Sequence, residues 1–149
     1  MKRGSVKLIA AGLIALLVSV LVLTSPLAAS STIDKPFAID GVTRTLTPGQ
    51  VDWYAFPYLG DESQIEGFLP EGTSFGIAFS VFTKDQVLRL PGDGVEPVGR
   101  GTFNEFGPVV LSWSGNFSVP GFYFVRVENT SVDPGSYVLR ISSSSLRLP

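Results

Sequence analysis

The sequence predicts an all-β protein, an antiparallel β-sandwich of jelly-roll or immunoglobulin-like type with about eight or nine strands. After Ser31 no stretch has a sustained helical period, and strand-length runs rich in Val, Ile, Phe and Tyr recur instead. Gly, Pro, Asp and Asn separate these runs. Several runs alternate in polarity, as strands do when one face meets a second sheet and the other meets water.

Turn residues delimit the expected strands from the N-terminal side. Asp40-Gly41 and Pro48-Gly49 are typical turn pairs, because Pro presets the first turn angle and Gly accepts a positive φ. Pro70-Glu71-Gly72 makes a third turn. These breaks predict strands over 37–39, 42–46, 50–58, 63–69 and 75–83.

The second half of the chain continues the same pattern. A short run at 86–90 is expected to pair with the preceding strand as a hairpin, and the Gly- and Pro-rich stretch 91–106 is expected to be a loop. Three further strands are expected over 109–114, 121–128 and 136–142. We therefore expect a linker over 30–36, the sandwich over 37–142, and a disordered serine-rich tail over 143–149.

Residues 1–29 are expected to form a signal helix that directs export. Three basic residues precede a long apolar run, and small residues follow it, an order typical of a secretory signal peptide. We expect cleavage after Ala29, with Ala28 and Ser30 as neighbouring alternatives. Because a membrane span needs about 20 apolar residues, an uncleaved anchor through residues 8–29 is the alternative. Either outcome places the rest of the chain outside the cytoplasm.

The composition excludes several classes of function. The chain has 11 basic and 13 acidic residues; three of the basic ones lie in residues 1–29, so 8 remain against 13 after cleavage. This acidic balance argues against nucleic acid as a partner. The chain has no Cys and no His, so it can form neither a disulfide nor a Ser-His-Asp triad. We expect a protein that is not an enzyme.

Three motifs carry a resemblance to a known family. They are D-W-Y-x-F at 52–56 after a Pro-Gly turn, P-G-x-Y-x-V-R-V at 120–127 and G-S-Y-x-L-x-I at 135–141. In this order they resemble the bacterial pre-peptidase C-terminal domain, a β-sandwich found on secreted proteases and other exported proteins. The resemblance covers residues 37–142.

The resemblance implies a non-catalytic module, here a freestanding copy without an attached peptidase. Some relatives bind collagen or other substrates, with calcium near the first strand. Asp34 is the single acidic residue in that region of this chain, so calcium is not carried over. The acidic pairs Asp61-Glu62 and Asp93-Glu96 lack the spacing of a calcium loop, and we expect no cofactor.

Strand alternation separates expected core residues from expected surface residues. The inward set carries the structural motifs and comprises Asp52, Tyr54, Phe56, Tyr123, Val125, Val127, Tyr137, Leu139 and Ile141. Asp52, at the start of its strand, is expected to cap a turn rather than bind a ligand. Burying each large apolar side chain contributes about 1.5–3 kcal/mol.

The outward aromatic residues are the candidate binding residues: Trp53, Trp113, Phe122 and Phe124. Exposed aromatic rings on a flat sheet stack on sugars or form the centre of a protein interface. The alternative is that the loop within 91–106 folds across and covers them.

These observations predict an exported, extracytoplasmic, non-catalytic module that binds a protein, a glycan or the cell envelope. One alternative is a membrane-anchored envelope domain that assembles with copies of itself. The other is a hydrolase with paired carboxylates, which would need two acids about 5–10 Å apart in a cleft.

Overall fold

The structure is a computed structural model that describes residues 30–70, 72–90, 95–103 and 111–144. The expected signal helix at 1–29 and most of the expected tail lie outside the described residues, as do parts of the 91–106 stretch. In the described part of the chain, no helix is long and apolar enough to cross a membrane.

The described residues form ten strands and one short helix, most of them at the places where turn residues predict them. In chain order these elements are β1 (Arg44–Leu46), β2 (Val51–Tyr58), β3 (Ile65–Leu69), β4 (Ile77–Thr83), α1 (Lys84–Val87), β5 (Gly99–Arg100), β6 (Thr102–Phe103), β7 (Leu111–Gly115), β8 (Gly121–Asn129), β9 (Gly135–Tyr137) and β10 (Arg140–Ser143). All named strand pairs are antiparallel.

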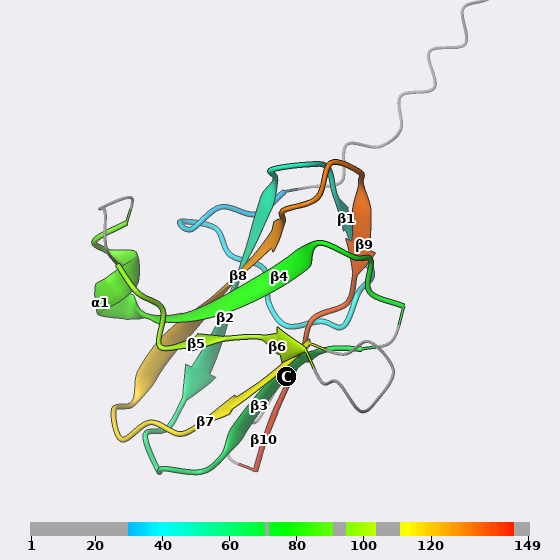
Figure 1. The fold of residues 1–149 in the computed structure, drawn as a ribbon. Helices are drawn as coiled ribbons and strands as arrows, with labels where there is room; N and C mark the ends of the chain where they lie inside the picture. The colour runs from blue at the N-terminus through cyan, green and yellow to red at the C-terminus, as the bar shows by residue number, and fades with distance from the viewer. Residues whose placement is uncertain (1–29, 71, 91–94, 104–110, 145–149) are drawn as a thin grey trace, which may run out of the picture.

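The strands form two four-stranded sheets and one two-stranded sheet (Figure 1). One large sheet has the order β2-β8-β4-β5 and the other β10-β3-β7-β6, while β1 pairs with β9. The long strands β2 and β8 pair over their whole length, from Val51 opposite Glu128 to Tyr58 opposite Gly121. This register fixes which side chains share each face of the first sheet.

The inner faces of both large sheets supply one hydrophobic core. Tyr54 and Phe56 from β2 and Val125 and Val127 from β8 meet Ile65 from β3 in it. All nine side chains expected to face inward are buried: Asp52, Tyr54, Phe56, Tyr123, Val125, Val127, Tyr137, Leu139 and Ile141. The molecule is therefore a β-sandwich whose long strands alternate between a buried and a water-facing side.

Several expected elements differ from the structure. The run at 37–39 forms only a single bridge, between Phe37 and Tyr54. The expected strand at 136–142 divides into β9 and β10, because the chain leaves β1 after Tyr137 and continues on β3 in another sheet. Residues 30–36, expected as a linker, are partly anchored on the domain, since Ser31 is buried and bonded to β2.

Another difference is a helix where a hairpin strand was expected at 86–90. The Thr83 hydroxyl accepts a hydrogen bond from the backbone N–H of Gln86, and the Gln86 side chain accepts one from the Thr83 N–H. This reciprocal capping box stabilises the first turn of α1 directly after β4. The helix turns the chain back, so that β5 returns along the edge of β4.

Candidate binding groove

The outer face of the β2-β8-β4-β5 sheet carries three of the four expected binding aromatics. Trp53 projects from β2, and Phe122 and Phe124 project from β8, each alternating with buried core residues. In the strand register, Trp53 lies opposite Arg126 on β8, which lies opposite Ser80 on β4, which lies opposite Arg100 on β5. One row across the sheet therefore brings an aromatic ring, a hydroxyl and two guanidinium groups together.

A groove of about 380 Å³ lies over this row, and we name it the Trp53 groove. The half-buried Trp53 packs against Phe82, with ring centroids 5.7 Å apart and the planes tilted by 50°. The segment that follows α1 forms the opposite wall. The residues that line the groove are Trp53, Ser80, Phe82, Leu90, Val95, Pro97, Arg100 and Arg126.

The position of that wall explains why Phe82 is buried on an outer face. Phe82 is only 4% exposed although its strand neighbours Val81 and Phe79 face the core. The Gln86 amide donates a 2.6 Å hydrogen bond to the carbonyl of Glu96, and the Val98 N–H bonds to the carbonyl of Val81. These bonds hold residues 96–98 against the sheet, so the described part of the 91–106 stretch covers Phe82 and leaves Trp53 half-buried.

Two ion pairs border the groove. Arg126 contacts Glu128 on the same strand at 2.7 Å, and Arg100 contacts Glu96 at 2.8 Å. Exposed pairs of this kind contribute about 0–1 kcal/mol to stability. The groove itself is lined by the two guanidinium groups and the Ser80 hydroxyl, and the two carboxylates balance the charge of the arginines.

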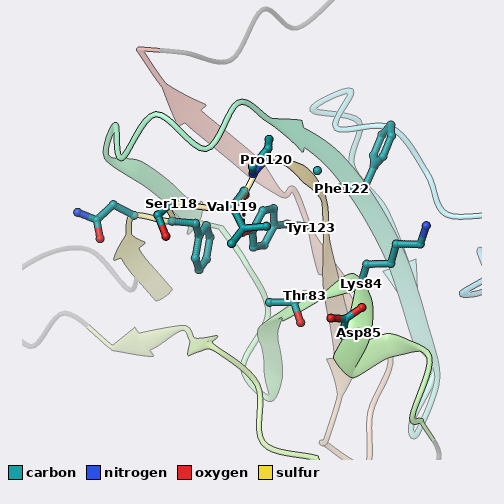
Figure 2. Close-up of a pocket in the computed structure, with 11 residues that line it drawn as sticks. Thr83, Lys84, Asp85, Ser118, Val119, Pro120, Phe122 and Tyr123 are labelled. Atoms are coloured by element: carbon teal, nitrogen blue, oxygen red, sulfur yellow. Dashed lines mark hydrogen bonds between the residues drawn. The ribbon is translucent and has the colours of Figure 1, made fainter.

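Phe122 lines a second hollow, at the end of the sheet beside the start of α1. This hollow has a volume of about 500 Å³ and lies between the β7–β8 connection and residues 83–85 (Figure 2). Tyr123 packs against Phe117 there, with centroids 4.1 Å apart, and donates a hydrogen bond to the Val119 carbonyl. Burial raises the pKa of Tyr123. Phe122 lies at the rim of this hollow and is 56% exposed.

Trp113 does not share this face, so its expected outward position is wrong. It lies on β7 with Leu111 and packs against the hydrophobic core, half-buried and stacked on Phe117. Gly99 lies so close to the indole that a Cβ there would overlap it. Trp113 therefore covers the edge between the two large sheets. This position follows from the pairing of the strands and not from the sequence pattern of β7.

The inner face directly behind the groove carries a polar network around Asp52. Tyr137 donates a 2.7 Å hydrogen bond to Asp52 Oδ2, the Ser31 N–H donates to Oδ1 at 3.0 Å, and the Tyr54 and Tyr137 hydroxyls lie 2.9 Å apart. Asp52 is therefore not the turn cap expected from its position, because its oxygens are bonded to residues 21 and 85 positions away. Burial raises the pKa of Tyr137, and its bond to Asp52 acts in the same direction.

Other titratable groups have structural partners. Burial raises the pKa of Tyr54, and the Arg44 guanidinium bonded to Asp40 holds the pKa of that carboxyl at about 2. A hydrogen bond from the Ser63 side chain lowers the pKa of Asp61. Among the described residues, no three acidic, His or Cys side chains gather closely enough to hold a metal ion.

The sequence did not single out Phe82, Ser80, Arg100 or Arg126. For Ser80, Phe82 and Arg126 a signal was present, since each alternates with core residues on its strand. For Arg100 there was none, because the return of β5 to β4 depends on α1.

Solved structures that are similar to this chain include the following two. One is the pre-peptidase C-terminal domain of collagenase from Bacillus anthracis, with 15% identity, 77% of this chain and 96% of that chain covered, and a TM-score of 0.47. The other is PliG from Aeromonas hydrophila, a periplasmic inhibitor of g-type lysozyme, with 18% identity, 68% and 83% covered, and a TM-score of 0.45. No protein-family model and no curated protein matches the chain.

Proposed function

We propose that this protein is an exported, non-catalytic module that binds a carbohydrate in the Trp53 groove. The observation that carries the proposal is the composition of one row of the outer face. There the half-buried indole of Trp53 lies in line with Arg126, Ser80 and Arg100, at the base of a groove of about 380 Å³.

The chemistry of the groove suits a sugar ring. An indole face packs against the apolar C–H face of a sugar while its edge stays in contact with water. Guanidinium groups donate hydrogen bonds in a fixed fork, and the Ser80 hydroxyl can donate or accept one, so Arg126, Arg100 and Ser80 can bond the hydroxyls of a sugar. Because the charges of both pairs cancel, an uncharged glycan is the ligand class that fits. The volume lies in the range of ligand pockets, about 300–1,000 Å³.

A non-catalytic role agrees with the placement of the perturbed groups. Catalytic acids and bases are usually the groups whose pKa values a site shifts. In the described residues the shifted tyrosines and Asp40 have hydrogen-bond or packing partners in the fold, and none of them lines the Trp53 groove. The chain also has no His and no Cys to serve as general base or nucleophile.

Export places the groove outside the cytoplasm, where the glycans of an envelope or a surrounding matrix are available. This part of the proposal rests on the basic, apolar and small-residue order of residues 1–29. If that segment is retained, the same groove is presented from the membrane surface, as in the anchored alternative.

The test uses the two tryptophans as separate reporters. A Trp113→Phe variant retains Trp53 as its single indole, and a glycan bound in the groove should change its fluorescence on titration. Trp53→Ala should weaken binding about tenfold, since an aromatic contact contributes about 0.5–1.5 kcal/mol beyond its buried area. Arg126→Gln should weaken binding at least about tenfold, since a hydrogen bond from a charged group contributes about 1.5–3 kcal/mol. Thermal unfolding confirms that each variant is folded.

Phe122→Ala and Arg140→Gln are the matched controls, because these residues are exposed outside the groove. Both should retain wild-type affinity. Full glycan binding by Trp53→Ala, or binding only to proteins on a combined glycan and protein array, would contradict the proposal.

A further inference from the structure

The carboxylate of Asp52 is buried without a cationic partner in the described residues. The side chain is 2% exposed, and its two hydrogen bonds come from neutral donors, the Tyr137 hydroxyl and the Ser31 N–H. The ion pairs of the described chain do not include it, and Arg44 is bonded to Asp40. A buried carboxylate is costly unless a positive charge compensates it.

Ser31 is held in the position from which such a charge could act. Its hydroxyl donates a 2.7 Å hydrogen bond to the Trp53 carbonyl and lies 2.6 Å from the Trp53 N–H. Its own backbone nitrogen is 3.0 Å from Asp52 Oδ1. Ser31 is 6% exposed whereas Ser30 is exposed, so the chain reaches solvent at the bond between them.

The sequence around that bond matches what a signal peptidase accepts. Small residues are needed at the first and third positions before the cut. For the Ser30–Ser31 bond these are Ser30 and Ala28, both small, whereas for a cut after Ala29 the third position is Leu27. The bond next to Ser31 therefore fits the pattern better than the position expected from the general shape of the segment.

We propose that export includes hydrolysis of the Ser30–Ser31 bond and that the new α-ammonium group of Ser31 forms a buried ion pair with Asp52. A signal peptidase adds water across the amide, so Ser30 retains the carboxylate and Ser31 gains the ammonium group. Charge-assisted hydrogen bonds are about twice as strong as neutral ones. Because Ser31 is buried in the folded domain, the cut precedes folding, and cleavage completes the polar network of the core.

This inference depends on the export that the proposed function includes, and it makes a sharper claim. A cut after Ala29 would place the ammonium group on Ser30, which is exposed. Ser30 is one residue before Ser31, with the two Cα atoms about 3.8 Å apart. A retained N-terminal segment would leave Asp52 with neutral donors. Only a mature chain that starts at Ser31 pairs the two charges.

The first experiment determines the N terminus of the full-length chain expressed in a bacterial secretion host. Intact mass and N-terminal sequencing of the extracytoplasmic protein should show a start at Ser31. An extracytoplasmic protein that starts at Ala29 or Ser30, or that retains residues 1–29, overturns the inference and leaves export standing. An uncut protein confined to the cytoplasm overturns both export and the inference.

The second experiment tests the ion pair in the exported protein. Mild periodate cleaves the Cα–Cβ bond of an N-terminal serine and removes its amine, and we expect folded wild type to react at least tenfold more slowly than protein in guanidinium. After complete modification, the melting temperature should fall by about 5 °C more in wild type than in Asp52→Asn. Loss of the Ser31 hydroxyl is common to both backgrounds and cancels in this comparison.

Glu128→Gln is the matched control, because Glu128 is a carboxylate on the outer face of the neighbouring strand. It should respond to periodate as wild type does. Equal temperature shifts in wild type and Asp52→Asn overturn the ion pair. If Asp52→Asn does not fold, equal periodate rates in folded and unfolded wild type overturn it instead.

Discussion

Two adjacent residues of β2, Asp52 and Trp53, belong to two regions with opposite properties. Asp52 faces inward, is 2% exposed and lies in a network whose polar atoms are bonded to other parts of the chain. Trp53 faces outward into a groove bordered by ion pairs that water also reaches. One strand therefore contributes to the core with one set of side chains, and the alternate set lines the groove that we propose binds a glycan.

The difference in burial determines what a mutation costs. When a partner is removed in the inner network, the remaining donor or acceptor loses its bond and water cannot replace it, which costs about 1–3 kcal/mol for each group. When a charge is removed at the outer groove, solvent replaces the lost contact. Stability and binding should therefore respond to mutation almost independently.

The largest expected effect is the loss of the inner carboxylate. Asp52→Ala should lower the free energy of unfolding by about 3 kcal/mol, because it leaves the Tyr137 hydroxyl and the Ser31 N–H without an acceptor. Glu128→Ala, the outer carboxylate, should cost less than about 1 kcal/mol. Urea unfolding measures both, and equal costs would show that the two faces do not differ.

A smaller effect is expected from one hydroxyl of the same network. Tyr137→Phe should cost about 2 kcal/mol, since Asp52 Oδ2 loses its donor and the Tyr54 hydroxyl loses its partner. Tyr58→Phe is the control, because its hydroxyl bonds the Ser63 carbonyl outside this network. The comparison fails if Tyr58→Phe is the more destabilising of the two in denaturant titrations.

Alkaline pH should lower the free energy of unfolding through the tyrosines of the inner network, without any mutation. The pKa values of Tyr54 and Tyr137 are raised by burial, so these groups retain protons in the folded state at pH values where the unfolded state ionises. Their stabilisation is complete below the unfolded pKa of about 10 and is lost above it, by about 1 kcal/mol per tyrosine at pH 11. The free energy of unfolding, measured from pH 8 to pH 11, should fall as the pH rises. The fall should be smaller in Tyr137→Phe.

The smallest effect is expected at the partly exposed pair of Asp40 and Arg44. The pKa of Asp40 is lowered from 3.8 to about 2 by Arg44, so the pair stabilises the fold above pH 3.8 and loses this contribution as the pH falls through 2. The Asp40 side chain is 39% exposed, so Asp40→Asn should cost less than about 1 kcal/mol at pH 6. A difference between variant and wild type that persists at pH 2 would contradict this assignment.

The sequence predicted correctly those features that depend on neighbouring residues, such as strand alternation and turns. The period of two placed Tyr54, Tyr123 and Tyr137 on inward faces, and turn pairs such as Pro48-Gly49 marked where strands begin. It failed at α1, although Thr83 and Gln86 carry the spacing of a capping box, because the apolar residues that follow read as a strand. It failed at Trp113 because a period of two separates the faces of a strand without stating which one meets the core.

The sequence by itself determined that most of the chain forms strands and which residues share a side of β2 and β8. Only the tertiary structure decided that Ser31 reaches Asp52 and that Arg100 lies in one row with Trp53. The physical reason is range: alternation follows from the backbone geometry of neighbouring residues. Contacts between distant residues depend instead on sheet order and on the turn at α1, which fix where each strand pairs.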